Sequence, residues 1–120
     1  MPKGLLIMKY DNKSGMEIES KYPNEGISIS DESLMAILGL HGFSKEEGVA
    51  SLTVGDTNLV TYYSGKSINY YVGLILNKHE NTDEFEDWLK EIAHIILENL
   101  QEEKYINMLP ALFTQITSLI

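Results

Sequence analysis

The feature that most constrains the fold is a run of closely spaced strand and turn signals between Gly48 and Asn77. Three segments there are rich in β-branched and aromatic residues, which favour extended backbone. They lie at 48–55, 58–64 and 68–77. Asp56-Thr57 and Gly65-Lys66 supply turn residues between them. Because parallel strands need a long crossover, this short spacing predicts an antiparallel three-stranded meander.

The second of these turns contains Gly65-Lys66-Ser67, the letters that end a nucleotide-binding P-loop. A P-loop also needs a glycine at position 60, which is Val60 here, and a helix directly after the loop. The residues on both sides are instead typical of strands. The stretch therefore predicts a hairpin turn, and we expect no nucleotide site.

Hydrophobic periodicity predicts the remaining elements. An N-terminal hairpin is expected at 3–10 and 16–22, with Met16, Ile18, Ser20 and Tyr22 on one side of its second strand. Ser30 is a suitable N-cap for a first helix. Asn81 and Glu84 suggest a capping box for a second helix that runs to about Gln101. The uncharged segment 105–120 reads as a third helix that begins or kinks near Pro110.

These elements predict an α+β fold with a five-stranded antiparallel sheet. The first and fifth strands are the most continuously apolar, so we expect them at the centre of the sheet. The second and third strands should be the edges. In the second helix we expect Trp88, Leu89 and Ile92 to be buried and His94 to be solvated.

Composition narrows the function. The length of 120 residues fits a single domain, 1–120. The net charge is −9 and every basic residue is a lysine, which makes nucleic acid a poor partner. The N-terminal apolar run is too short for a signal peptide, and no segment is long enough to span a bilayer, so we expect a cytoplasmic protein.

No catalytic or cofactor motif emerges. Cysteine is absent, and the three histidines lack a metal-ligand spacing, so we expect no metal and no cofactor. No serine lies in a nucleophile elbow. We therefore expect a protein that is not an enzyme.

From GLLIMKYDNKSGMEIE to FEDWLKEIAHIILENL, the element order resembles the longin domain. The resemblance implies the sheet order 2-1-5-4-3, with one helix on one face and two on the other. The related roadblock and profilin folds usually begin with a helix. Longin domains mostly bind proteins, so the resemblance implies a non-catalytic interaction domain in membrane trafficking or small-GTPase regulation. A small GTPase or another longin or roadblock subunit is the expected kind of partner.

In several longin domains a partner segment lies between the first helix and the third strand. The third strand here also carries no charge along Val49 to Val54, although exposed edges are usually guarded by charge. We therefore expect this edge to pair with a second copy, giving a homodimer, or with an extended peptide. The predicted contact residues are Leu34, Ile37, Leu38, Val49, Ser51, Leu52, Thr53 and Val54.

Two alternatives remain open at this stage. The chain could be a small-ligand sensor of profilin-like or roadblock-like type, with a pocket lined by tyrosines. Because adjacent strand residues point to opposite faces, at most two of Tyr62, Tyr63, Tyr70 and Tyr71 share a side. The C-terminal segment could be a deeply buried helix or one that faces a partner.

Overall fold

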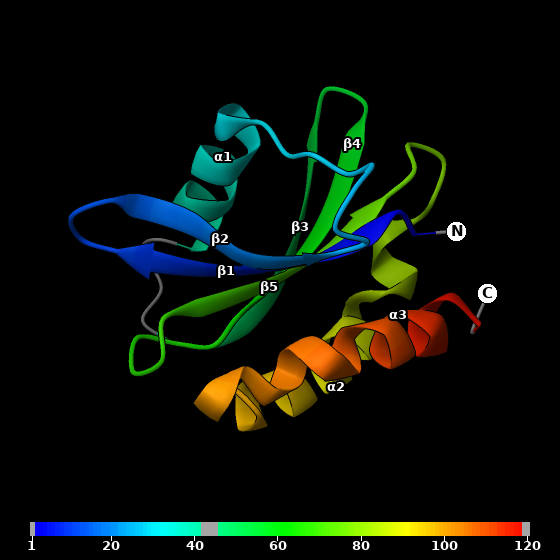
Figure 1. Cartoon of the computed structure of the whole chain (residues 1–120). Coiled ribbons are helices and arrows are strands. Elements are labelled where there is room, and N and C mark those ends of the chain that lie inside the picture. The colour runs from blue at the N-terminus through cyan, green and yellow to red at the C-terminus, as the bar shows by residue number, and fades with distance from the viewer. Residues whose placement is uncertain (1, 42–45, 119–120) are drawn as a thin grey trace.

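A computed structural model describes residues 2–41 and 46–118 (Figure 1). The five strands are β1 (Gly4–Asp11), β2 (Gly15–Tyr22), β3 (Gly48–Val54), β4 (Thr57–Tyr63) and β5 (Tyr70–Leu76). The helices are α1 (Asp31–His41), α2 (Glu86–Glu98) and α3 (Leu109–Thr117). Two 3₁₀ segments, η1 (Thr82–Glu84) and η2 (Gln101–Met108), precede α2 and α3.

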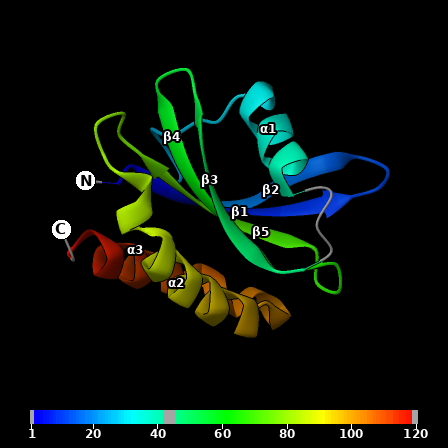
Figure 2. The ribbon, with the colours of Figure 1, turned by 180° about the vertical axis from the view of Figure 1, so that it is seen from behind.

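The strands form one antiparallel sheet in the order β2-β1-β5-β4-β3. Helix α1 lies on one face, and α2 and α3 lie side by side on the other (Figures 1 and 2). The predicted fold class and strand order are confirmed. The two most apolar strands, β1 and β5, pair at the centre, as continuous burial requires.

Each face of the sheet buries its own apolar cluster. The α2–α3 face carries the larger cluster, which includes Leu89, Ile92 and Ile96 of α2. The α1 face carries a smaller one around Ile37. The tyrosine pairs divide between the faces as strand alternation predicts. Tyr62 and Tyr70 belong to the first cluster, and Tyr63 and Tyr71 to the second.

Strand β2 contradicts the predicted side assignment. Ile7 pairs with Ser20 but Met8 pairs with Ile18, so Glu19 is an extra residue that forms a β-bulge. One extra residue reverses the alternation of everything beyond it. Met16 therefore packs on the α1 face, whereas Tyr22 packs on the α2–α3 face. The Ser20 hydroxyl likewise meets the Tyr105 hydroxyl of η2 at 2.9 Å.

The Gly-Lys-Ser segment joins two paired strands, which confirms the hairpin. Its loop is longer than the predicted two-residue turn. Tyr63 still pairs with Tyr71, and β5 begins at Tyr70 rather than Ile68. Gly65 and Asn69 both adopt positive φ, and the Ser64 hydroxyl accepts a hydrogen bond from the Tyr70 amide at 2.9 Å. The Asn69 amide also donates to the Gly65 carbonyl at 2.9 Å, so hydrogen bonds within the loop fix its conformation.

The helix starts follow local side-chain chemistry. The Ser30 hydroxyl accepts a hydrogen bond from the Ser33 amide at 3.1 Å, which confirms the predicted N-cap of α1. The Asn81 side chain caps η1 instead of α2, so α2 begins only at Glu86. Pro110 stands in the first turn of α3, where its missing N–H costs nothing.

Burial in α2 agrees with the prediction except at one residue. Leu89 is 0% exposed and Ile92 is 3% exposed, but Trp88 is 40% exposed. Trp88 lies at the margin of a broad apolar stripe, where the sheet no longer reaches it. The expectation that Trp88 is buried was therefore wrong.

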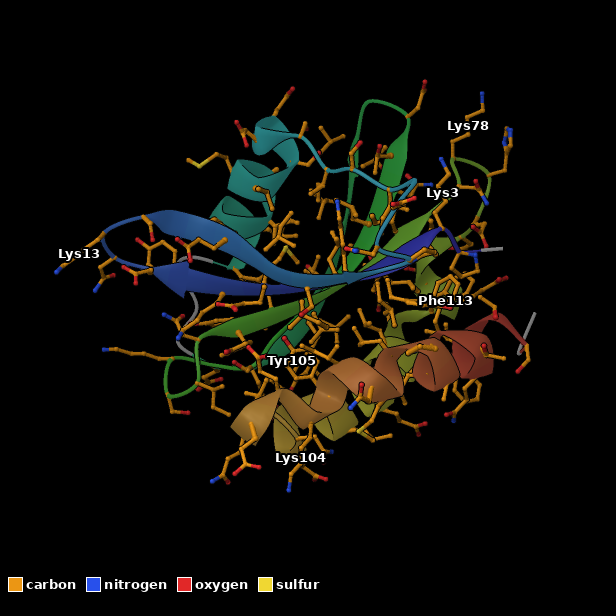
Figure 3. The ribbon with its side chains drawn as sticks, in the orientation of Figure 1. Lys3, Lys13, Lys78, Lys104, Tyr105 and Phe113 are labelled. Carbon is orange, nitrogen blue, oxygen red and sulfur yellow. The ribbon has the colours of Figure 1, made fainter. Side chains whose placement is uncertain are left out.

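The segment after α2 reverses direction at Glu102 and Glu103, which both have positive φ. It then buries Tyr105, Leu109, Leu112 and Ile116 along a single stripe. Phe113 packs beside that stripe against Tyr22, with ring centroids 5.6 Å apart, and Figure 3 shows Tyr105 and Phe113 between the helices and the sheet. The apolar residues of this segment mostly serve the core. Across the described parts of the chain, no helix has both the length and the apolar character needed to cross a membrane.

Candidate interaction surface

Strand β3 is an edge of the sheet, as predicted. It pairs with β4 in continuous register over seven residues, from Gly48–Tyr63 to Val54–Thr57. None of its seven residues is charged. A regular strand of this kind leaves one side of its backbone available for pairing.

The register identifies which backbone groups point outward. Gly55 and Asp56 form a two-residue hairpin loop between Val54 and Thr57, so Val54 and Thr57 form a hydrogen-bonded pair. Hydrogen-bonded and non-hydrogen-bonded pairs alternate along an antiparallel ladder. Leu52 and Ala50 therefore direct their backbone groups toward β4. The amides and carbonyls of Val49, Ser51 and Thr53 point away from the sheet.

The side chains of these three outward-bonding residues lie on the α2–α3 face. Val49 packs against the cluster of that face. The Ser51 hydroxyl donates a hydrogen bond to the Glu86 carboxylate of α2 at 2.8 Å. The exposed Thr53 hydroxyl donates to the Asn58 side chain at 2.6 Å. Their side chains are thus anchored within the domain while their backbone groups face outward.

The predicted groove residues lie mainly in the core layer between α1 and the sheet. Ile37 is 0% exposed, so it supports this region but cannot contact a partner directly. Leu34, Leu38 and Leu52 are half-buried and pack against the same cluster as Ile37. Val54 is also half-buried, at the end of β3. The prediction that Ile37 contacts a partner was wrong, because helix and strand side chains bury it completely.

A hollow of about 360 Å³ lies on the other side of the molecule, between β2 and α3. Its lining includes Ser20, Lys21 and Tyr22 of β2 and Ile106 and Leu109 of the C-terminal segment. The tyrosines proposed for a sensor pocket lie elsewhere, since Tyr62, Tyr63 and Tyr71 are each at most 5% exposed within the two clusters. The sheet faces around those tyrosines are packed with side chains.

His41 is a buried group whose environment the sequence reasoning missed. Its Nε2 atom lies 2.6 Å from the Thr61 hydroxyl, which also donates to the Ala50 carbonyl of β3. Thr61 therefore accepts a hydrogen bond from the Nε2–H group of His41. The rings of Tyr63 and Tyr71 lie 5.8 and 5.6 Å from the imidazole. Burial lowers the pKa of His41 below its ordinary value of 6.5, because the cation would lose its hydration. The sequence did offer one indication that His41 is buried, since at helical spacing it falls on the same side of α1 as Ile37.

A second polar cluster joins the start of β3 to α2. The Tyr62 hydroxyl donates to the Glu47 carboxylate and lies 3.1 Å from His94 Nε2. His94 is thus hydrogen-bonded as well as partly exposed, and its Nε2 atom is 3.7 Å from the Glu47 carboxylate. The hydrogen bond from Tyr62 lowers the pKa of Glu47, whereas burial, followed by the Glu47 contact, raises the pKa of Tyr62.

This second cluster fixes Glu47, the residue that leads into β3. Within residues 2–41 and 46–118, no three histidine, cysteine, aspartate or glutamate side chains converge as metal ligands would. Comparisons of the chain with protein-family models and with curated proteins find no match. The geometry of β3 is therefore the main guide to function.

Proposed function

We propose that this chain is a non-catalytic protein-interaction domain that receives an extended partner segment along β3. The observation that carries the proposal is the seven-residue, uncharged and unbulged edge with outward backbone groups at Val49, Ser51 and Thr53. Strand addition to such an edge gains main-chain hydrogen bonds, and flanking side chains supply selectivity. The half-buried Leu34, Leu38, Leu52 and Val54 offer those flanking contacts.

Charge favours a different chain over a second copy as the added strand. If two copies paired antiparallel over all seven residues, Ser51 would face Ser51 of the other copy. That register would set Glu47 against Gly55 and Glu46 against Asp56. Like charges directly opposite each other destabilise a pair of strands. Pairing of two copies over the full length of β3 is therefore disfavoured by the carboxylates that flank the strand, whereas a foreign segment without acidic ends avoids this repulsion.

The resemblance to longin domains supports the same class of function. The strand order β2-β1-β5-β4-β3, with one helix on one face and two on the other, agrees with what that resemblance implies. We therefore propose a role in membrane trafficking or small-GTPase regulation. A small GTPase or another longin or roadblock subunit is the proposed kind of partner.

The hollow beside β2 supports a second candidate function, the binding of a small ligand. Its volume of about 360 Å³ falls within the size range of ligand pockets. Two of its polar side chains already have partners, however. The Ser20 hydroxyl meets Tyr105, and the Lys21 ammonium donates to the Ile27 carbonyl at 3.3 Å. Fewer groups therefore remain to orient a ligand, and the interaction domain is the better-supported proposal.

The experiment that tests the proposal introduces charge on β3. Thr53→Lys should reduce recovery of partner proteins from a native lysate and reduce any self-association in sedimentation, while circular dichroism stays unchanged. Ile18→Lys is the matched control, because it places the same charge at an exposed position of the opposite edge. Unchanged sedimentation and unchanged partner recovery in the Thr53 variant would contradict the proposal.

A further inference from the structure

The exposed side of α3 carries no charge. The buried stripe of this helix faces the sheet, and its solvent-exposed residues are Pro110, Ala111, Thr114, Gln115 and Ser118. The outward side of a helix in a soluble domain normally carries charged residues. Depletion of charge is instead characteristic of the centre of a protein–protein interface. Because the apolar stripe is already buried, core packing does not explain the missing charges.

Trp88 of α2 adds a large exposed aromatic ring beside this helix. Residues Glu86 and His94 of α2 contact Ser51 and Tyr62, so their side of the helix faces β3 and β4. At 100° per residue, Trp88 lies on the opposite side, which is turned toward α3. Helices α2 and α3 run antiparallel and side by side, so the start of α2 lies near the end of α3 (Figures 1 and 2). Trp88 is 40% exposed there.

The charged residues on the Trp88 side of α2 are negative. On a helix surface the nearest neighbours stand three and four residues away. For Trp88 the exposed one among these within α2 is Glu91. Asp87 precedes Trp88 in the chain, and the exposed Glu84 ends η1 just before α2. The nearest lysine of this helix, Lys90, lies roughly 160° away around the axis, given a turn of about 100° per residue. The facing helix α3 supplies no cation.

We propose that Trp88 and the exposed side of α3 form a second docking surface, which binds a protein segment carrying lysine or arginine. This α2–α3 surface has the anatomy of an interface. Its centre is depleted of charge, its aromatic side chain can anchor a partner, and its rim is charged. The rim carboxylates Glu84, Asp87 and Glu91 determine the charge of the partner. The surface lies on the opposite face from α1 and is independent of pairing at β3.

Trp88 is the only tryptophan, so its fluorescence reports directly on this surface. The probe is a synthetic amphipathic peptide of lysine and leucine, titrated into the full chain at low salt. We expect a saturable change in tryptophan emission that weakens as salt is added. The triple variant Glu84→Gln, Asp87→Asn, Glu91→Gln should bind the peptide about tenfold more weakly, because it loses three exposed ion pairs that each contribute modestly.

A matched triple variant separates local recognition from net charge. Glu17→Gln, Asp31→Asn and Glu32→Gln remove the same amount of charge from exposed positions at the β1–β2 hairpin and on α1, away from this surface. This control should keep the original affinity. A labelled form of the peptide should also bind Trp88→Ala several-fold more weakly than the original chain. Equal weakening by both triple variants, or unchanged affinity in Trp88→Ala, would overturn the proposal.

Discussion

The two edge strands of the sheet, β2 and β3, differ in how well their exposed backbone is protected against pairing with another strand. Strand β2 carries Glu17, Glu19 and Lys21, and an inserted residue at Glu19 breaks its register with β1. Strand β3 carries no charge and keeps continuous register with β4. Charge and bulges are the usual means of preventing an edge from pairing with another strand. The difference indicates that β2 is protected against pairing and that β3 is available for it.

The bulge in β2 also improves packing. It turns Ser20 and Tyr22 toward the α2–α3 face, where they meet Tyr105 and Phe113, and leaves Met16 on the α1 face. An unbulged strand with the same residues would send Met16 and Tyr22 to the same face. Protection of the edge and burial of both faces thus follow from one inserted residue.

The largest expected loss of stability comes from a proline in β3. Its size should depend on whether the lost amide bonds to β4 or points outward. Leu52→Pro removes an amide that bonds to β4 and should lower the free energy of unfolding by about 3 kcal/mol or more, in addition to the lost side-chain packing. Thr53→Pro removes an outward amide, which an edge strand tolerates. Its cost should be about 1 kcal/mol, mostly from the lost bond to Asn58. Urea unfolding measures both values, and equal costs would contradict the assigned register.

Lowering the pH below about 6.5 should reduce the free energy of unfolding through His41, which is buried between α1 and the sheet. The folded-state pKa of His41 lies below the unfolded value of 6.5, so the unfolded chain binds more protons in this range. Stability from the neutral imidazole is present above about pH 6.5 and is lost as pH falls toward the lower folded-state pKa. His41→Gln should flatten this part of the profile. Urea unfolding between pH 7 and pH 5, compared for both chains, measures the difference.

The smallest change in stability is expected from deleting Glu19. Residues 20–22 would then follow Ile18 in regular alternation and keep their present faces, so the free energy of unfolding should change by only about 0.5 kcal/mol. The edge would become straighter and lose a charge. We expect the deletion variant to self-associate at concentrations where the original chain does not, as sedimentation velocity would show. A deletion variant that stays as monodisperse as the original chain would contradict the protective role of the bulge.

Much of the fold could be predicted because the burial of whole strands appears directly in their composition. The continuous apolar runs of β1 and β5 place both strands at the centre. The bulge at Glu19 could not be predicted, because Glu17, Glu19 and Lys21 alternate regularly with the other residues of β2 whether or not one of them is an extra residue. Ser20 on the supposed apolar side was the one discordant residue.

The candidate surface on β3 could be predicted only in part, because the sequence shows which residues are charged but not which backbone groups point outward. The absence of charge in β3 is visible in the sequence, but the choice of outward amides depends on where the hairpin closes. The sequence placed that turn at Asp56-Thr57, whereas Gly55 and Asp56 form it. Ile37 and Trp88 show the same limitation, since a helical stripe does not reveal how far the sheet extends beneath it.

Residue-resolved amide exchange in β3 tests the central claim most directly. In the dilute isolated chain, Val49, Ser51 and Thr53 should exchange rapidly, while Ala50 and Leu52 should be protected by their bonds to β4. When a partner recovered through β3 is bound, the first three amides should become protected and the other two should change little. Protection of Val49, Ser51 and Thr53 already in the dilute chain, or no added protection in the complex, would contradict an edge that is open for strand addition.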